Sequence, residues 1–549
     1  MRRPYTLLYM CLLTLPLPAQ TGNHNAEIAR NLETFNDIYR QLDTYYVDSL
    51  SADTVIEWAI NSMLSHVDPF TSYHPEDDEE LRQMASGKYA GIGSVIRFST
   101  RENRAVISEP YEGTPSQVAG LRAGDVLLTI DDTDVDGMPI EDVTQRLRGE
   151  AGTNVEVKVR RPGAEQPLTF TLTRKTIQLP VIPYYGIEGD PSEGIGYLLL
   201  TGFTEGAMIE TRQALLDLKA QGMRRLVLDL RDNPGGALDE AVNIVNLFVP
   251  RGRKVVYTKG KIPSSNREYF TSSEPLDTLM PVVVLVDGGS ASAAEILAGS
   301  LQDMDRAVVV GNRTYGKGLV QSIHDLPYRG NLKLTVSRYY IPSGRCIQAY
   351  DYRHLNADGS VGTVPDSLTR EFHTMAGRSV RDGGGIKPDV VLDPDSLPTF
   401  IYDLFSGEEL FNYATQYVVS HPTIAPAGEF SLSDEEYQQF VAYVQQSGFS
   451  ANRRSEKVLQ LLKDAAKAEG YLEEAQDEFD ALEAKLNKDI AADLERLKDD
   501  VLPYLNTEIV SRYELQRGAC KQQLRGDKGF EEAVRLLQNE DEYESILRP

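Results

Sequence analysis

A serine and a glutamate stand three positions apart where an apolar strand-like run gives way to a helix-forming segment. Residues 281–287 are apolar and β-branched, two glycines interrupt the run, and 291–301 has helix-forming composition. Ser292 at such a turn could attack a carbonyl carbon, because free N–H groups at a helix start stabilise an oxyanion. Ser292 and Glu295 also fit a capping box, which only satisfies those N–H groups. Both interpretations of Ser292 stay open at this point.

Lys317 lies between two glycines after another buried-type strand, residues 307–310. Residues 311–317 fit the G-x-x-x-x-G-K spacing of a phosphate-binding loop. Such a loop needs Ser or Thr after its lysine and a helix behind it, whereas here Gly318 follows and 319–323 alternates like a strand. We therefore predict that no nucleotide binds at this loop.

A lysine held beside a serine in an apolar pocket acts as a general base. Desolvation lowers the pKa of the amine from about 10.4 toward neutrality, and the free amine then takes the hydroxyl proton. Gln321 could orient that amine by a hydrogen bond, and it fits the wet face of a strand equally well. A solvated turn is the plainer alternative for Lys317. The histidine nearest these loops is His324, and a Ser-His-Asp triad lacks an obvious histidine.

A third loop offers backbone hydrogen-bond donors. Residues 225–230 predict a strand, an Asn-Pro-Gly-Gly turn follows, and 237–248 predicts a helix. Gly235 or Gly236 could bring one N–H against a ligand, and Ala293, directly after the serine, could bring the other. The same four residues also make a common turn. Three strand-to-loop transitions with helices between them predict a parallel sheet whose loops converge at the carboxyl ends of the strands.

These three motifs, in this order, resemble the carboxyl-terminal processing peptidases, tail-specific serine endopeptidases with a crotonase-like core. The family's Ser-Ala-Ser-Ala-x-Glu box falls on 290–295 and its Gly-Lys-Gly-x-x-Gln box on 316–321. The lysine follows the serine by 317 minus 292, or 25, positions, which is the usual family spacing. By this resemblance Ser292 is the nucleophile, Lys317 is the general base and Gln321 positions the lysine.

An upstream glycine-rich segment resembles a PDZ domain. The stretches 89–96 and 113–130 carry this likeness. In PDZ domains a loop of this type offers backbone N–H groups to the terminal carboxylate of a peptide, which adds as a strand to the sheet edge. By this resemblance the carboxylate-binding loop consists of Gly91, Ile92 and Gly93.

The chain of 549 residues is long enough for several domains, and we predict a multidomain α/β protein. The expected parts are a signal peptide over 1–20, an N-terminal helical segment over 21–86, an inserted PDZ domain over 87–174, a crotonase-like peptidase core over 175–400 and an acidic helical C-terminal domain over 401–549. Within the core, residues 350–385 are rich in Gly, Asp, Ser and Thr and predict a long irregular loop that could cover the site.

The first residues are typical of an export signal. Arg2 and Arg3 precede an apolar run over 7–17, which ends in small residues and is too short to span a membrane as a stable helix. We expect secretion across the inner membrane to the periplasm or cell envelope.

The net charge and the spacing of Cys and His limit the classes of partner and cofactor that we expect. The net charge of −26 argues against nucleic acid, whose phosphates would be repelled. The Cys and His residues show no metal-type spacing, so we expect neither a metal nor a cofactor. The C-terminal helices over 455–547 are either a solvated bundle or a surface for an adaptor protein or a homodimer, and these alternatives stay open.

The leading hypothesis is a Ser/Lys endopeptidase that cleaves exported proteins after its PDZ domain has captured their C-terminal tails. The alternative is a catalytically silent PDZ scaffold that only binds peptides. A protein that merely binds peptides does not need the serine, the lysine, the glutamine and the glycines together, so we favour the enzyme.

Overall fold

The computed structural model describes residues 20–75, 87–327, 330–355, 360–393, 397–486 and 489–548. The predicted signal peptide, apart from Gln20, lies outside these residues. Within the described part of the chain, no helix combines the length and the apolar character that a membrane crossing requires.

The central sheet has six strands, and they stand in the order β10-β11-β12-β15-β16-β23. Strands β11 to β23 pair in parallel, while β10 is an antiparallel edge strand. Every residue of β15 is buried, as expected for a strand covered on both faces. This arrangement confirms the predicted parallel sheet. The bounds are β10 Tyr184–Ile187, β11 Ile195–Leu199, β12 Arg225–Asp229, β15 Val282–Val286, β16 Val308–Gly311 and β23 Val390–Val391.

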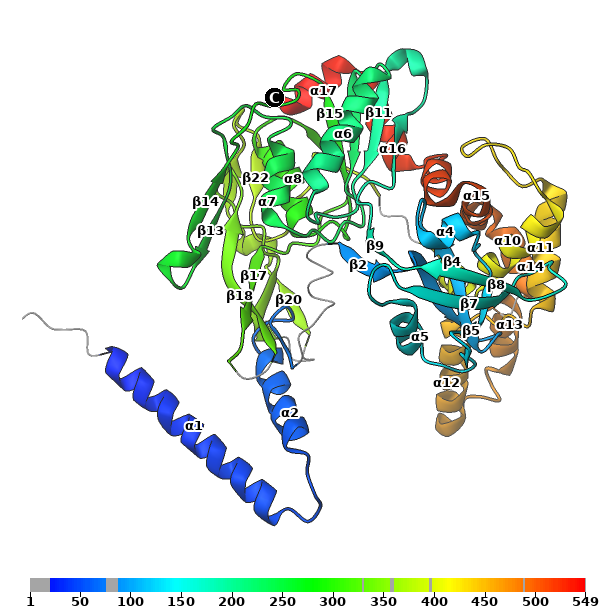
Figure 1. Ribbon diagram of the computed structural model, residues 1–549, viewed down its shortest axis with the longest axis horizontal. Coiled ribbons are helices and arrows are strands. Elements are labelled where there is room, and N and C mark those ends of the chain that lie inside the picture. Colours follow the sequence, from blue (N-terminus) through cyan, green and yellow to red (C-terminus); the bar gives the residue numbers. More distant parts are fainter. Residues whose placement is uncertain are drawn as a thin grey trace, which may run out of the picture.

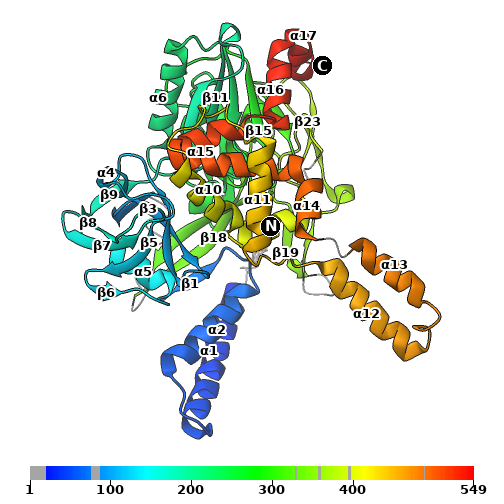
Figure 2. The same ribbon diagram turned by 90° about the vertical axis from the view of Figure 1, so that its right-hand side faces the viewer.

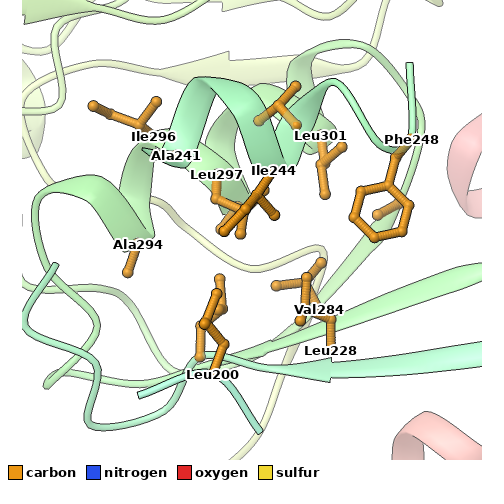
Figure 3. Packing of buried hydrophobic residues seen from close by; sticks show 14 of the residues in the cluster. Leu200, Leu228, Ala241, Ile244, Phe248, Val284, Ala294, Ile296, Leu297 and Leu301 are labelled. Carbon is orange, nitrogen blue, oxygen red and sulfur yellow. The ribbon is translucent and has the colours of Figure 1, made fainter. Parts of the chain in front are cut away.

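One face of the central sheet is covered by α6 (Ala207–Ala220), α7 (Leu238–Val245) and α8 (Ala293–Asp303) (Figure 1). Figure 3 shows Ile244 and Leu297 of these helices packed over Leu228 and Val284 of the sheet. Burial of these side chains removes apolar surface from water and fixes the helices on the strands.

The other face of the central sheet is covered by the end of the chain. Helices α16 (Lys528–Gln538) and α17 (Glu540–Leu547) place Phe530, Leu536 and Tyr543 against sheet residues such as Val227 and Val283. Figure 1 shows these two helices beside β11 and β15. The last helices of the chain therefore complete the core of the sheet that carries the candidate loops.

A second, five-stranded sheet lies beside the central one and is formed by β1 Ser72–His74, β13 Lys254–Gly260, β14 Arg267–Phe270, β17 Leu319–Asp325 and β18 Asn331–Tyr340. Helices α1 (Gln20–Tyr45) and α2 (Ala52–Ser65) precede β1 and stand away from the body. The irregular loop predicted over 350–385 is wrong, because two hairpins form there. Their strands are β19 Tyr350–Leu355 with β20 Val361–Thr363, and β21 Glu371–His373 with β22 Ser379–Arg381.

The segment that resembles a PDZ domain forms its own antiparallel sheet with a separate core. Strands β2 and β9 pair with each other where the chain enters and leaves this segment. The bounds are β2 Lys88–Gly91, β3 Ser94–Ser99, β4 Arg104–Pro110, α4 Pro115–Ala119, β5 Val126–Ile130, β6 Thr133–Asp134, α5 Ile140–Leu147, β7 Asn154–Arg160, β8 Leu168–Thr173 and β9 Lys175–Gln178.

The C-terminal helices pack around α10 and α15. The hairpin of α12 and α13 projects from the body (Figure 2). The PDZ-like segment docks on these helices, because the Arg97 guanidinium lies 3.8 Å from the ring centroid of Phe411 and Oγ of Ser99 donates to Glu408 at 2.8 Å. The bounds are α9 Thr399–Ser406, α10 Glu409–Ser420, α11 Asp434–Gln446, α12 Arg454–Glu469, α13 Gln476–Leu486, α14 Ile490–Arg496 and α15 Lys498–Gln523.

Candidate active site

Ser292 occupies a strained turn between β15 and α8. Its backbone has φ +56° and ψ −113°, a conformation that residues other than glycine rarely adopt. The preceding residue is fixed, since the Ala291 N–H donates to the carbonyl oxygen of Asn233 at 2.9 Å. Strain of this kind persists only where the surroundings hold it, and it gathers at functional sites.

Glu295 joins the serine loop to the lysine loop. Its Oε2 accepts from the N–H groups of Ser292 and Lys317 at 2.8 and 2.9 Å, and its Oε1 accepts from the Gly316 N–H at 2.7 Å and the Thr314 hydroxyl at 2.5 Å. The backbone nitrogens of Ser292 and Lys317 therefore lie within 5.7 Å, the sum of their two distances to Oε2. The capping interpretation of Glu295 describes only its bond to Ser292.

The environment of Glu295 shifts the titration of its carboxyl group. Burial raises the pKa to about 7, and the hydrogen bonds from Thr314, Lys317, Gly316 and Ser292 oppose this rise by favouring the charged form. The side chain is fully buried. A carboxyl group is tolerated there because its oxygens accept four hydrogen bonds from the two loops.

Tyr339, on β18, forms hydrogen bonds to the backbone of the same two loops. Its hydroxyl oxygen lies 3.0 Å from the carbonyl oxygen of Ser292 and 2.6 Å from that of Lys317. The side chain is buried, and burial raises its pKa well above the ordinary value, so the hydroxyl stays protonated and able to donate.

The side chain of Lys317 lies against apolar surface, with Nζ 4.2 Å from the ring centroid of Phe70. Burial is the largest cause of a lowered pKa for this amine, and the like charge of Lys333 lowers it further. The carboxylates of Asp68 and Glu295 act in the opposite direction. A partly buried amine with a lowered pKa is the state that a lysine base requires.

The side chains of Ser292 and Lys317 do not contact each other directly in this structure. Among the residues that the structure describes, no hydrogen bond joins Oγ of Ser292 to Nζ of Lys317. The side-chain amide of Gln321 donates to Oγ1 of Thr335 at 3.3 Å. Catalytic hydrogen bonds commonly tighten only when substrate is bound, so the open contact does not exclude the pair.

A cavity of about 350 Å³ opens beside Ser292. Its wall is mainly apolar with a few polar groups, as is typical of ligand pockets. Both the candidate nucleophile and Gln321 border it. The lining residues are Gly236, Ala237, Leu238, Ser292, Ala293, Ile296, Leu319, Val320, Gln321, Ile323, Lys333 and Tyr339.

The two candidate glycines differ in what their N–H groups do. The Gly235 N–H donates to Oδ1 of Asn233 at 2.9 Å and is already used. A Cβ at Gly235 would lie 2.8 Å from the Ala293 nitrogen, so the serine turn packs directly on this glycine. Within the described ranges, no hydrogen bond uses the N–H of Gly236 or of Ala293, and both residues line the cavity.

The predicted carboxylate-binding loop connects β2 to β3, outside the cavity lining. Gly93 has φ +78°, and a Cβ there would lie 2.4 Å from Cβ of Thr114. The carbonyl oxygen of Ile92 accepts from the N–H and the hydroxyl of Ser116, at 2.9 and 2.8 Å. These contacts fix the loop beside the start of α4.

Sequence reasoning missed the roles of Phe70, Lys333 and Tyr339, and it treated Glu295 only as a cap. Phe70 belongs to the His-Val-Asp-Pro-Phe segment at 66–70, far from the lysine loop in sequence. Only the Glu295 carboxylate had a local signal, its place at the start of an alanine-rich segment. An acidic side chain that is buried in such a segment needs hydrogen-bond donors around it.

We expect Glu295→Gln to loosen the site. In either orientation the amide nitrogen replaces an oxygen that accepts a backbone N–H, and a buried unsatisfied group costs about 1–3 kcal/mol. The rate at which a fluorophosphonate labels Ser292 should fall at least tenfold, and the midpoint of urea unfolding should fall as well. Glu268→Gln, at a half-exposed carboxylate paired with Lys254, is the matched control. An unchanged labelling rate and midpoint would contradict the role assigned to Glu295.

Comparisons with known proteins cover most of the chain. The family described as Peptidase family S41 matches residues 194–361, a PDZ domain matches 106–161, and a probable PDZ-protease C-terminal helical domain matches 400–537. A carboxy-terminal-processing protease of Bartonella bacilliformis is 35% identical over 64% of this chain and 78% of its own length. A carboxyl-terminal-processing protease of Synechocystis sp. is 36% identical over 57% of this chain and 70% of its own length.

Among solved structures, a photosystem II D1 C-terminal processing protease is 30% identical, covers 66% of this chain and 93% of its own length, and has a TM-score of 0.35. The sequence relatives and the three domain matches agree on one assignment. The chain belongs to peptidase family S41 and is a serine protease of the carboxyl-terminal processing type.

Proposed function

We propose that this protein is a serine endopeptidase in which Ser292 is the nucleophile and Lys317 is the general base. The observation that carries the proposal is the Glu295 carboxylate, which binds the N–H groups of both residues beside a cavity that Ser292 lines. A fold that needed only a capped helix would not require the cap to reach the second loop.

The proposed reaction starts with a neutral Lys317 amine, which burial favours. The amine takes the proton from Oγ of Ser292, and the oxygen attacks the scissile carbonyl carbon. The N–H groups of Ala293 and Gly236 receive the oxyanion. The ammonium group then gives its proton to the leaving amine, which leaves an acyl-enzyme. Water gives a proton to the same lysine as it attacks the ester carbon. The bond from that carbon to Oγ of Ser292 then breaks, the ammonium returns the proton to Oγ, and the carboxylic acid product leaves.

Gln321 has a proposed positioning role in this reaction. It lines the cavity beside Ser292, and its amide donates to Thr335. We infer that the amide oxygen accepts from the Lys317 ammonium after the lysine has moved toward the serine, which would hold the amine in line for proton transfer.

The PDZ domain has a proposed role in capturing C-terminal tails. Strand β3 stands at the end of its sheet order, and Gly91, Ile92 and Gly93 lead directly into it. A peptide that adds beside β3 would bring its terminal carboxylate to this loop. We infer that exported proteins with unstructured tails are bound in this way before cleavage.

We also propose the domain boundaries of this protein and the compartment in which it acts. We infer a crotonase-like core over 175–400, a signal peptide over 1–20 and action in the periplasm or cell envelope. The pairing of β2 with β9 supports a PDZ domain over 87–174, because it brings together the two points at which the chain enters and leaves. The helices over 401–549 offer surfaces for an adaptor protein or a second copy, notably the projecting hairpin of α12 and α13.

Ser292→Ala and Lys317→Ala test the assignment directly. Each variant should reduce cleavage of an unstructured, tailed protein at least a thousandfold, since removal of a nucleophile or its base leaves only oxyanion and binding effects. Cleavage is followed by mass spectrometry of the products. Full activity in Ser292→Ala, with contaminating proteases excluded, would contradict Ser292 as the nucleophile, whereas absence of cleavage by the unmodified protein would support a catalytically silent PDZ scaffold.

The rate of acylation should rise with pH through the lowered pKa of Lys317, because only the neutral amine accepts the serine proton. Lys333→Met removes a like charge that lowers this pKa, so the rising limb should move to higher pH. Lys463→Met on α12 is the control and should leave the limb in place. A limb that stays fixed in Lys333→Met would contradict the coupling of the two amines.

Amidation of the substrate's C-terminus should weaken capture by the PDZ domain. Loss of the carboxylate removes the group that the Gly91 to Gly93 loop is proposed to bind, so KM should rise about tenfold or more with a smaller change in kcat. Paired peptides with free and amidated ends, cleaved at the same site, give the comparison. Equal KM values for the pair would count against tail recognition.

A further inference from the structure

The start of α16 contacts the loop that carries the proposed oxyanion donor. Arg231 lies two residues after β12 and holds a carboxylate on either side. Its Nε lies 3.0 Å from both carboxylate oxygens of Asp229, its Nη1 donates to Oδ1 of Asp527 at 3.0 Å, and its Nη2 lies 2.7 Å from Oδ2 of Asp527. Asp527 comes from the far end of the chain and is the residue before α16.

A second contact from the same helix reaches Asp229. Phe530 packs edge-on against Tyr197, with ring centroids 5.6 Å apart. The hydroxyl of Tyr197 donates to Oδ2 of Asp229 at 2.8 Å. Asp229 is buried, so its orientation depends on these partners.

The short segment between Arg231 and Gly236 is fixed by hydrogen bonds. Asp232 has φ +55°, and its N–H donates to Oδ1 of Asp287 at 3.0 Å. The buried Asn233 donates from Nδ2 to the carbonyl oxygen of Leu200 at 2.7 Å and accepts from the Gly235 N–H. A shift at Arg231 would therefore reach the glycine donor through only four residues, of which Asp232, Asn233 and Gly235 are held by hydrogen bonds.

We propose that Asp527 is a positioning residue for the Gly236 N–H, through Arg231 and Asp229, so that the C-terminal helical domain sets the efficiency of the oxyanion site. This inference rests on the proposed function. Without its second carboxylate the Arg231 guanidinium is held by Asp229 alone, which leaves its Nη1 end without a partner from α16, and the loop relaxes with it. Displacement of a catalytic donor by about 1 Å costs up to a hundredfold in rate.

Oδ1 of Asp527 serves both the cap of α16 and Nη1 of Arg231, whereas Oδ2 contacts Nη2 of Arg231, so the charge and the Oδ2 contact can be removed while Oδ1 is kept. Asp527 also accepts from the Phe530 N–H at 2.9 Å and so caps α16. Asparagine caps helices about as well as aspartate but carries no charge. Asp527→Asn therefore keeps the cap and weakens the ion pair with Arg231.

The experiment compares kcat and KM of the full chain and its Asp527→Asn variant on a short fluorogenic peptide. We expect kcat to fall about tenfold while KM stays within twofold, and the affinity for a peptidyl aldehyde, which forms a tetrahedral adduct, to fall by the same factor as kcat/KM. Asp489→Asn, at the capping residue of α14, is the matched control and should change neither value. Titration with a fluorophosphonate normalises each rate to reactive Ser292.

Arg231→Lys is a second, independent test of the inference. It keeps the positive charge but loses the planar guanidinium group that binds both carboxylates. Its kcat should fall by a similar factor, and the double variant should be no worse than the poorer single one. An unchanged kcat in either folded single variant, or losses that multiply in the double variant, would overturn the inference. If the unmodified chain itself left the peptide uncut, the proposed function would fail instead.

Discussion

Glu295 joins the loops that carry Ser292 and Lys317, and the geometry of the candidate site depends on its buried carboxyl group. Its oxygens gather the N–H groups of Ser292 and Lys317 and two further donors from the lysine loop. Desolvation alone would make a carboxylate costly there, and these donors offset that cost. The strained backbone of Ser292 is therefore supported from within α8, and the lysine loop is held against it by the same group.

The parallel sheet makes this meeting of loops feasible, because β12, β15 and β16 end at one edge. The sheet in turn needs cover on both faces. Helices α7 and α8 cover one face and the last two helices of the chain cover the other. The C-terminal helices also contact the PDZ domain through Arg97 and Phe411. The helical domain thus contacts both the PDZ domain and the loop that is proposed to hold an oxyanion donor.

Local patterns were sufficient for the turn at Ser292, the strand after Lys317 and the parallel sheet, because composition and periodicity decide each of them within a few residues. Long-range contacts were not predictable in this way. The choice between the two glycine donors depends on the Asn233 side chain. The lowered pKa of Lys317 depends on burial beside Phe70, which precedes β1, and on the charge of Lys333 on β18. The strands found within 350–385 form despite a loop-like composition, because hydrogen-bonded pairing with a neighbouring strand stabilises segments whose intrinsic strand propensity is low.

Competitive acetylation of the amines, read peptide by peptide with mass spectrometry over a range of pH, measures the pKa of Lys317 in the intact protein. This amine is partly buried against Phe70 and repelled by Lys333, so its pKa should lie below those of exposed lysines such as Lys261. A Lys317 that titrates together with the exposed lysines would contradict its role as the base for Ser292.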